Sequence, residues 1–312
     1  MTPEGSPPGL PVVLYLPGPA WLPSDPDPDP DPDPDPDPDL DPDPDLDTDP
    51  TPDIDPGADP GTEPGLDPAS ASDSAWFSAS ASEERFIADL ALGADAAVVV
   101  PEIGRAGSRR AAARALVREL AYWLADKGPA AGLDGSRVAL VGSSTGGALA
   151  VAALAAGRHG DGPRFRALVL LGPALDATMD TPSHGRFGTR APGRGALAEF
   201  WRQYTSRDRT SGEHTRGDLD GGGSPGAPSP AELSGAPPVL VVTAETDVLR
   251  DEGEAYGRGL CEAGVSAVTV RYAGAGPGFV TLDAHHASAA ARAARSQVVD
   301  TLYVALHVRG HC

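Results

Sequence analysis

The chain has 312 residues and a formal net charge of −21, and 40% of its residues are hydrophobic, which is enough apolar material for a globular core. Seventeen aspartates lie between Asp25 and Asp67, so the acidity belongs to one segment and the rest of the chain is close to neutral. Because no basic stripe is present to neutralise phosphates, the composition argues against nucleic acid as a partner.

The two cysteines, Cys261 and Cys312, are too few for a disulfide framework and show no metal-ligand spacing. The first ten residues lack the basic and apolar regions of a signal peptide. No apolar run approaches the ~20 residues that a membrane-spanning helix needs. We therefore expect a cytoplasmic protein with no membrane span and no metal site.

The first part of the chain, residues 1–24, contains a short apolar strand at 12–16. Residues 25–82 follow as a low-complexity linker built mostly from Asp-Pro repeats. Each proline fixes φ and removes an amide donor, and the carboxylates repel one another, so we expect a disordered, extended spacer. Calcium binding is the alternative for this linker. It would need six to eight oxygens on a closing turn, which such a segment cannot form.

Residues 83–312 alternate short β-branched runs with alanine-rich stretches of helical pattern. This alternation predicts an α/β domain with a mostly parallel, doubly wound sheet that helices cover on both faces. Residues 176–235 interrupt it and are expected to form a short, degenerate cap region. The expected strands are 12–16, 96–100, 138–141, 167–171, 239–243 and 268–272, and the expected helices are 109–127, 147–156, 196–204, 251–263 and 284–306.

One serine lies where an apolar strand meets an alanine-rich helix. Gly142, Ser144 and Gly146 have the G-x-S-x-G spacing, which places a serine oxygen on a tight turn while the glycines let strand and helix approach closely. The same spacing surrounds Ser224, but no strand precedes it and Pro225 follows where a helix should begin. We predict Ser144 as a nucleophile; the alternative is a chance Gly-Ser turn.

The chain resembles the hormone-sensitive-lipase-like branch of the α/β hydrolases, which are bacterial carboxylesterases and lipases. The most similar stretches are 143–147, 175–183 and 242–253, together with an oxyanion-strand-like segment at 11–21. The resemblance implies the α/β-hydrolase fold, no cofactor, Asp247 as the triad acid, and an oxyanion hole from Gly18, Ala20 and Thr145. On the residues alone, Asp247 could equally be a helix N-cap.

The chain departs from the family pattern at the base and at the oxyanion hole. Pro277 stands where the family has its histidine, and loss of a triad histidine can cost on the order of a millionfold in turnover. Pro19 replaces a residue whose N–H normally holds the oxyanion, which costs about a hundred- to thousandfold. The family's acidic residue before the nucleophile is Ser143 here. We also expect the leading strands and part of the cap to be truncated.

A substitute base would have to come from another histidine. His285 and His286 follow Pro277 by eight and nine positions, where we expect the last helix to begin, and His285 is taken as the candidate. The competing interpretation is an exposed histidine in the first turn of that helix. The other histidines, including His184, are not assigned to the site.

Two functions remain open from the sequence. The first is a serine carboxylesterase-type hydrolase of small acyl esters, with weak activity because the base and one oxyanion donor are prolines. The second is a non-catalytic hydrolase-fold protein, which either binds a hydrophobic small molecule or is a drifting gene product without such a role. The oligomeric state is not predicted.

Overall fold

The structure is a computed structural model that describes residues 9–18, 83–101, 110–157, 164–188, 193–204 and 227–308. The linker expected at 25–82 lies outside the described residues, as do Pro19, Ala20 and the Ser224 turn. The interpretations of those segments therefore stay predictions.

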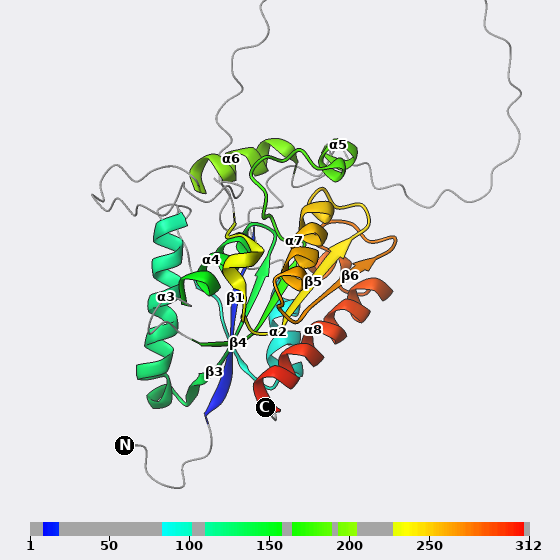
Figure 1. The fold of residues 1–312 in the computed structure, drawn as a ribbon. Helices are drawn as coiled ribbons and strands as arrows, with labels where there is room; N and C mark the ends of the chain where they lie inside the picture. Colours follow the sequence, from blue (N-terminus) through cyan, green and yellow to red (C-terminus); the bar gives the residue numbers. More distant parts are fainter. Residues whose placement is uncertain are drawn as a thin grey trace, which may run out of the picture. The chain divides into compact units, whose positions relative to one another are not determined.

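Six strands form one sheet in the order β2-β1-β3-β4-β5-β6, and every neighbouring pair is parallel. The carboxyl ends of all six strands therefore meet at one edge of the sheet, where loops can assemble a site (Figure 1). The predicted parallel sheet is confirmed. The strands are β1 (Leu10–Leu16), β2 (Ala97–Val99), β3 (Leu133–Ser143), β4 (Phe165–Leu171), β5 (Val239–Ala244) and β6 (Ala267–Tyr272).

Helices cover both faces of the sheet, as the alternation predicted (Figure 1). One face packs against α3 (Arg110–Lys127), α4 (Thr145–Gly157) and α7 (Arg250–Glu262), and the other packs against α2 (Glu84–Gly93) and α8 (Ala289–His307). Two helices of the cap region, α5 (Pro182–Phe187) and α6 (Arg194–Tyr204), lie beyond the carboxyl edge.

Side chains along β1 show why the sheet needs two layers of helices. Val12, Leu14 and Leu16 belong to the core on the α3–α4–α7 face, whereas Val13 and Tyr15 belong to the core on the α2–α8 face. Successive side chains of a strand point to opposite faces. An unbroken apolar run is therefore typical of a strand buried on both sides.

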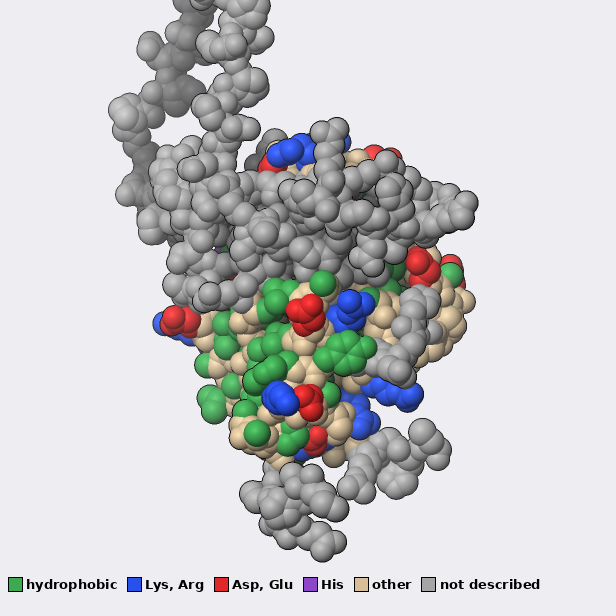
Figure 2. All heavy atoms as spheres, turned by 90° about the vertical axis from the view of Figure 1, so that its left-hand side faces the viewer, with side chains coloured by type: hydrophobic (Ala, Val, Ile, Leu, Met, Phe, Trp, Pro, Cys, Tyr) green, Lys and Arg blue, Asp and Glu red, His purple; other side chains and the backbone are tan. Residues whose placement is uncertain are grey.

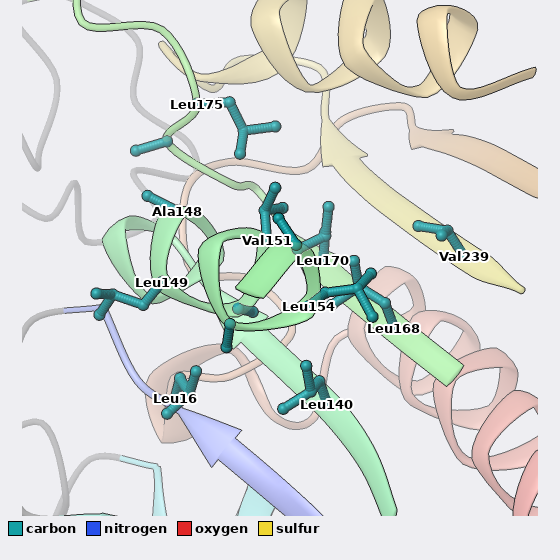
Figure 3. Packing of buried hydrophobic residues seen from close by; sticks show 14 of the residues in the cluster. Leu16, Leu140, Ala148, Leu149, Val151, Leu154, Leu168, Leu170, Leu175 and Val239 are labelled. Carbon is teal, nitrogen blue, oxygen red and sulfur yellow. The ribbon is translucent and has the colours of Figure 1, made fainter. Parts of the chain in front are cut away.

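Helix α4 is buried on all sides, with every residue from Thr145 to Ala155 inaccessible to solvent or nearly so. Figure 3 shows its side chains Leu149, Val151 and Leu154 packed among leucines of β1, β3 and β4. Tyr204 of α6 closes the outer side and donates a hydrogen bond to the Ala148 carbonyl at 3.3 Å. The helix that follows the predicted nucleophile is therefore fixed by the core.

Several boundaries differ from the sequence predictions. The last helix begins at Ala289 rather than at 284, because the Ser288 hydroxyl caps it by accepting the Ala291 N–H at 3.1 Å. His285 consequently lies in a separate 3₁₀ turn, Asp283–His285, and not in the first turn of α8. Helices α2 and α5 were not predicted.

No helix in the described ranges is long and apolar enough to cross a lipid bilayer. The face formed by α3 carries gathered hydrophobic side chains (Figure 2). Tyr122 and Trp123 of this helix are 42% and 47% exposed.

Candidate active site

Ser144 is the single residue between β3 and α4, and its φ is +50°. Its backbone is fully engaged: the N–H donates to the Leu171 carbonyl at 3.0 Å, and the carbonyl accepts from Gly147 and Ala174 at 3.0 and 2.9 Å. A left-handed serine costs about 1–2 kcal/mol and persists where its surroundings determine the conformation. The turn predicted at Ser144 is therefore present.

Gly18 brings the end of β1 against this turn. A Cβ at Gly18 would lie 2.5 Å from the Ser144 Cβ and 3.1 Å from its Oγ, so only a glycine backbone fits beside the hydroxyl. The Thr145 hydroxyl donates to the Gly18 carbonyl at 2.7 Å. The structure thus brings Gly18, Ser144 and Thr145 together, as the resemblance implied; Ala20 lies outside the described residues.

The backbone donors near Ser144 are not equivalent. The Gly18 N–H donates to the Ser143 hydroxyl at 3.2 Å and is therefore occupied. Thr145 is the first residue of α4, and a first-turn N–H has no partner within its helix. The positive end of the helix dipole also favours negative charge there. Of the two described residues, Thr145 is thus the better donor to a developing oxyanion.

Asp247 lies in the loop between β5 and α7 and is 4% exposed. Its Oδ1 accepts the Leu249 N–H at 2.9 Å, which forms a local turn two residues long rather than a helix cap. A Cβ at Gly172 would lie 2.9 Å from its Oδ2. The loop that starts at Gly172 also reaches Ser144 through Ala174, so Asp247 and Ser144 flank one short segment.

Burial raises the pKa of Asp247 to about 6, while the Leu249 N–H and the charge of Arg250 oppose that shift. An aspartate in this state is mostly ionised at neutral pH, and no described cation forms an ion pair with it.

Pro277 lies in the segment between β6 and α8. This segment packs on the loop between β5 and α7 that carries Asp247, called the acid loop below. The Ala275 carbonyl accepts both the N–H and the hydroxyl of Thr246, at 3.1 and 3.2 Å. The segment that contains Pro277 is thus joined to the loop that carries Asp247, and Pro277 itself has no titratable group.

His285 is exposed, and among the described residues no side-chain hydrogen bond joins it to Ser144 or Asp247. Its neighbour His286 faces away to helix α2, with Nε2 at 3.0 Å from the Asp89 carboxylate. The structure does not bring His285 to the other candidate residues.

Sequence reasoning left out a buried pair behind the acid loop. His184 Nε2 lies 3.6 Å from the Glu252 carboxylate, and its Nδ1 lies 2.8 Å from the Thr181 hydroxyl. Burial raises the pKa of Glu252 to about 8 and lowers that of His184, so both groups are mostly neutral at pH 7 and do not form an ion pair. Glu252 also accepts the Leu175 N–H at 2.6 Å, which ties α7 to the cap region.

The sequence indicated only the Glu252 side of this contact, because Glu252 follows Asp247 within the family-like stretch 242–253. His184 gave no comparable signal, since its environment comes from a separate element. Among the described residues, no group of three or more His, Cys, Asp or Glu side chains is arranged to hold a metal ion.

Comparison with known proteins decides the family. The sequence model of a family described as alpha/beta hydrolase fold matches residues 75–281. The chain belongs to the α/β-hydrolase fold family. The resemblance seen in the sequence is thereby confirmed, and the fold around Ser144 is that of the family.

Two curated relatives of this α/β hydrolase are esterases. Ethyl acetate hydrolase of Pseudomonas putida is 37% identical over 155 residues, which cover 46% of this chain and 43% of that protein. Carboxylesterase NlhH of Mycobacterium tuberculosis is 33% identical over 146 residues, covering 46% of this chain and 44% of that protein. The chain thus spans less than half the length of the curated relatives it matches.

Solved structures give the same result at the level of the fold. A thermostable esterase from Pseudomonas putida ECU1011 is 27% identical, with a TM-score of 0.69 and coverage of 98% of this chain and 78% of that chain. A hyperthermophilic esterase from Pyrobaculum calidifontis shares the fold, at 24% identity, a TM-score of 0.62 and coverage of 96% and 78%. The protein therefore shares the α/β-hydrolase fold of these esterases.

Proposed function

We propose that this α/β hydrolase is a serine carboxylesterase-type protein for small acyl esters, with Ser144 as its nucleophile and with weak turnover. The supporting observation is the placement of the Ser144 hydroxyl on a left-handed turn, with the Gly18 backbone against its Oγ. Such a turn exposes a serine oxygen at the carboxyl edge of the sheet. The esterase activities of the relatives make acyl esters the substrate class of choice.

In the proposed reaction the Ser144 oxygen attacks the ester carbonyl. The N–H of Thr145, with that of Ala20, holds the negative charge that develops on the carbonyl oxygen. In the familiar arrangement Asp247 orients an imidazole that takes the serine proton. Here Pro277 stands at the sequence position of that imidazole, so in this proposal the proton goes to water or hydroxide. Oxyanion stabilisation and substrate binding alone leave roughly 10³–10⁴-fold acceleration over water.

A second function is favoured by the same substitution. Because Pro277 leaves Asp247 without a basic partner among the described residues, the site is also suited to binding a hydrophobic small molecule without turning it over. The exposed turn of His285 would have to move to supply a base, so neither function uses that residue.

Labelling with a fluorophosphonate, together with hydrolysis of p-nitrophenyl acetate, tests the proposal. Labelling and residual hydrolysis should disappear in Ser144→Ala. Ser224→Ala is the matched control, because it removes the serine of the other G-x-S-x-G match and should leave both signals unchanged. Equal signals in the wild type and in Ser144→Ala would remove the esterase proposal and favour the binding function.

A further inference from the structure

A buried carboxyl of α7 binds the backbone of the segment that follows β4. Glu252 is 4% exposed, and its Oε1 accepts the N–H groups of Leu175 and Asp176 at 2.6 and 3.3 Å. Its Oε2 lies 3.6 Å from His184 Nε2, which is too long for a strong hydrogen bond. A buried carboxyl is costly unless it is hydrogen-bonded, so the two backbone N–H groups are the contacts that offset this cost.

The place of Glu252 in its own helix does not explain why it is buried. It is the third residue of α7, where a carboxylate ordinarily stabilises a helix through its negative charge. Burial raises the pKa of Glu252 to about 8, so at pH 7 the carboxyl is mostly neutral and contributes little in this way. The side chain therefore serves the segment after β4 more than it serves α7.

The segment that Glu252 binds, residues 172–176, is called the β4 loop below, and it contacts both candidate site residues. At its start, a Cβ on Gly172 would lie 2.9 Å from the Oδ2 atom of Asp247. Two residues later, the Ala174 N–H donates to the Ser144 carbonyl at 2.9 Å. The position of the β4 loop therefore bears on the nucleophile turn and on the predicted acid.

Pro173 fixes the first half of the β4 loop by packing between two helices. Cβ atoms added at Gly147 of α4 and at Gly253 of α7 would lie 2.6 and 3.3 Å from its side chain. The proline ring thus fills the space that the two glycines leave open. The second half of the loop has no comparable packing partner of this kind on α7 except the Glu252 carboxyl, which binds it by hydrogen bonds.

We propose that Glu252 is a positioning residue for Ser144: by accepting the Leu175 N–H it keeps the neighbouring Ala174 N–H on the Ser144 carbonyl. The Leu175 N–H belongs to the peptide bond that follows Ala174, so a shift of one moves the other. Ser144 needs such support, because its positive φ is a costly conformation that persists only where the surroundings determine it. The effect on Ser144 reactivity rests on the proposed function, whereas the effect on the two loop amides does not.

The test compares two variants that separate the reach of the side chain from its acidity. Glu252→Gln keeps the length and an acceptor oxygen, and it resembles the neutral carboxyl of the wild type. Glu252→Asp keeps the carboxyl but removes one methylene group, so its oxygen no longer reaches the Leu175 N–H. Glu254→Asp is the matched control, because Glu254 is a carboxylate of the same helix whose described partners, Arg271 and Thr243, lie on β6 and β5.

Two measurements are made on each full-length protein at pH 7. The first is the rate of Ser144 labelling by a fluorophosphonate. The second is hydrogen exchange by NMR of the Leu175 and Ala174 amides, compared with that of the Val298 amide. Val298 is fully buried in α8, so its exchange reports the stability of the whole domain. A merely structural role of Glu252 would accelerate all three amides together.

A buried N–H that loses its acceptor predicts about tenfold faster Leu175 exchange in Glu252→Asp, with about tenfold slower labelling of Ser144. Ala174 exchange should rise with that of Leu175, while Val298 exchange should rise less than either. In Glu252→Gln and in Glu254→Asp, the labelling rate and the exchange of both loop amides should stay within about twofold of the wild type, because the acceptor of the Leu175 N–H is retained.

Unchanged loop exchange in Glu252→Asp would overturn the inference, as would equal acceleration of the Val298 amide or faster loop exchange with wild-type labelling. If Glu252→Asp does not fold, Glu252→Gln decides: wild-type values support the inference, and clearly faster exchange of the loop amides overturns it. If the wild type does not label at all, the esterase proposal fails, while the exchange of the Leu175 and Ala174 amides in Glu252→Asp still supports or overturns the inference.

Discussion

The two sides of the site differ in how they are built. On the nucleophile side, Ser144 lies between a buried strand and a helix that is buried on all sides, with Gly18 packed against its hydroxyl. On the side of the proposed acid, Asp247 is buried, and the segment after β6 that contacts its loop contains Pro277. The first side depends on backbone packing, whereas the second depends on the identity of one side chain in a loop.

This difference shows that core packing limits which substitutions are tolerated in some parts of a site and not in others. Changing the turn at Ser144 would disturb the core, since α4 and three strands meet there. Changing a loop residue from histidine to proline leaves the sheet and its helices intact. The fold is therefore clear from the structure, while the proposed turnover depends on the side chain at one loop position.

The largest effect should come from restoring the base. Pro277→His should raise kcat/KM for p-nitrophenyl acetate by about a hundredfold or more, toward the roughly millionfold that a triad histidine can contribute. The physical reason is that the Pro277 segment already packs on the acid loop through Ala275 and Thr246. The measurement is steady-state hydrolysis at pH 8.

Two further variants separate the effect of the new imidazole from the effect of removing a proline. Pro277→Ala should give no gain in kcat/KM. Adding Ser144→Ala to Pro277→His should abolish the gain that Pro277→His produces. No gain in Pro277→His itself, with a protein that unfolds cooperatively, would mean that the two sides of the site do not face a common substrate.

A smaller effect is expected on the pH dependence of the unfolding free energy, through Asp247. Because the pKa of Asp247 is raised to about 6 in the folded protein, the folded state keeps a proton that the unfolded state releases near pH 4. The unfolding free energy therefore falls as pH rises from about 4 to about 6, by roughly 3 kcal/mol for this group. Asp247→Asn should remove that share of the fall, as measured by urea unfolding at pH 4.5 and 7.

Glu262→Gln serves as the comparison, because Glu262 is an exposed carboxylate at the end of α7, the helix that follows the Asp247 loop. It should keep the wild-type pH dependence. An Asp247→Asn protein whose stability changes with pH as steeply as that of the wild type would show that Asp247 is not held in a desolvated state.

The smallest effect concerns the backbone strain on the nucleophile side. With φ at +50°, Ser144 occupies a conformation that glycine adopts freely. Ser144→Gly should therefore unfold with a free energy about 0.5–1 kcal/mol higher than Ser144→Ala. At the exposed Ser296 of α8 the order should reverse, because glycine is about 1 kcal/mol worse than alanine inside a helix. Denaturant unfolding of the four variants measures both differences, and the same order at both positions would contradict the strained turn.

Periodicity and turn chemistry were sufficient to predict all six strands. They also predicted five helices, which are α3, α4, α6, α7 and α8, but not α2 or α5. Two boundaries differ for separate reasons: the Ser288 hydroxyl caps α8 at Ala289, and the backbone of β3 extends back to Leu133, which pairs with Leu10 of β1. Helix α2 was not predicted because its amphipathic stretch adjoins the low-complexity linker. Helix α5 is only six residues long.

Local sequence by itself determined the turn at Ser144, since a strand pattern, two glycines and an alanine-rich helix specify it within about twenty residues. It also determined that a proline stands where the resembled family has its base. Only the tertiary structure decided which distant groups meet behind that turn. Tyr15, Ser143 and Gly18 come together because the parallel strands β1 and β3 end side by side at one edge of the sheet. Contacts of that kind leave no periodic signal in the chain, because each partner lies in a different element.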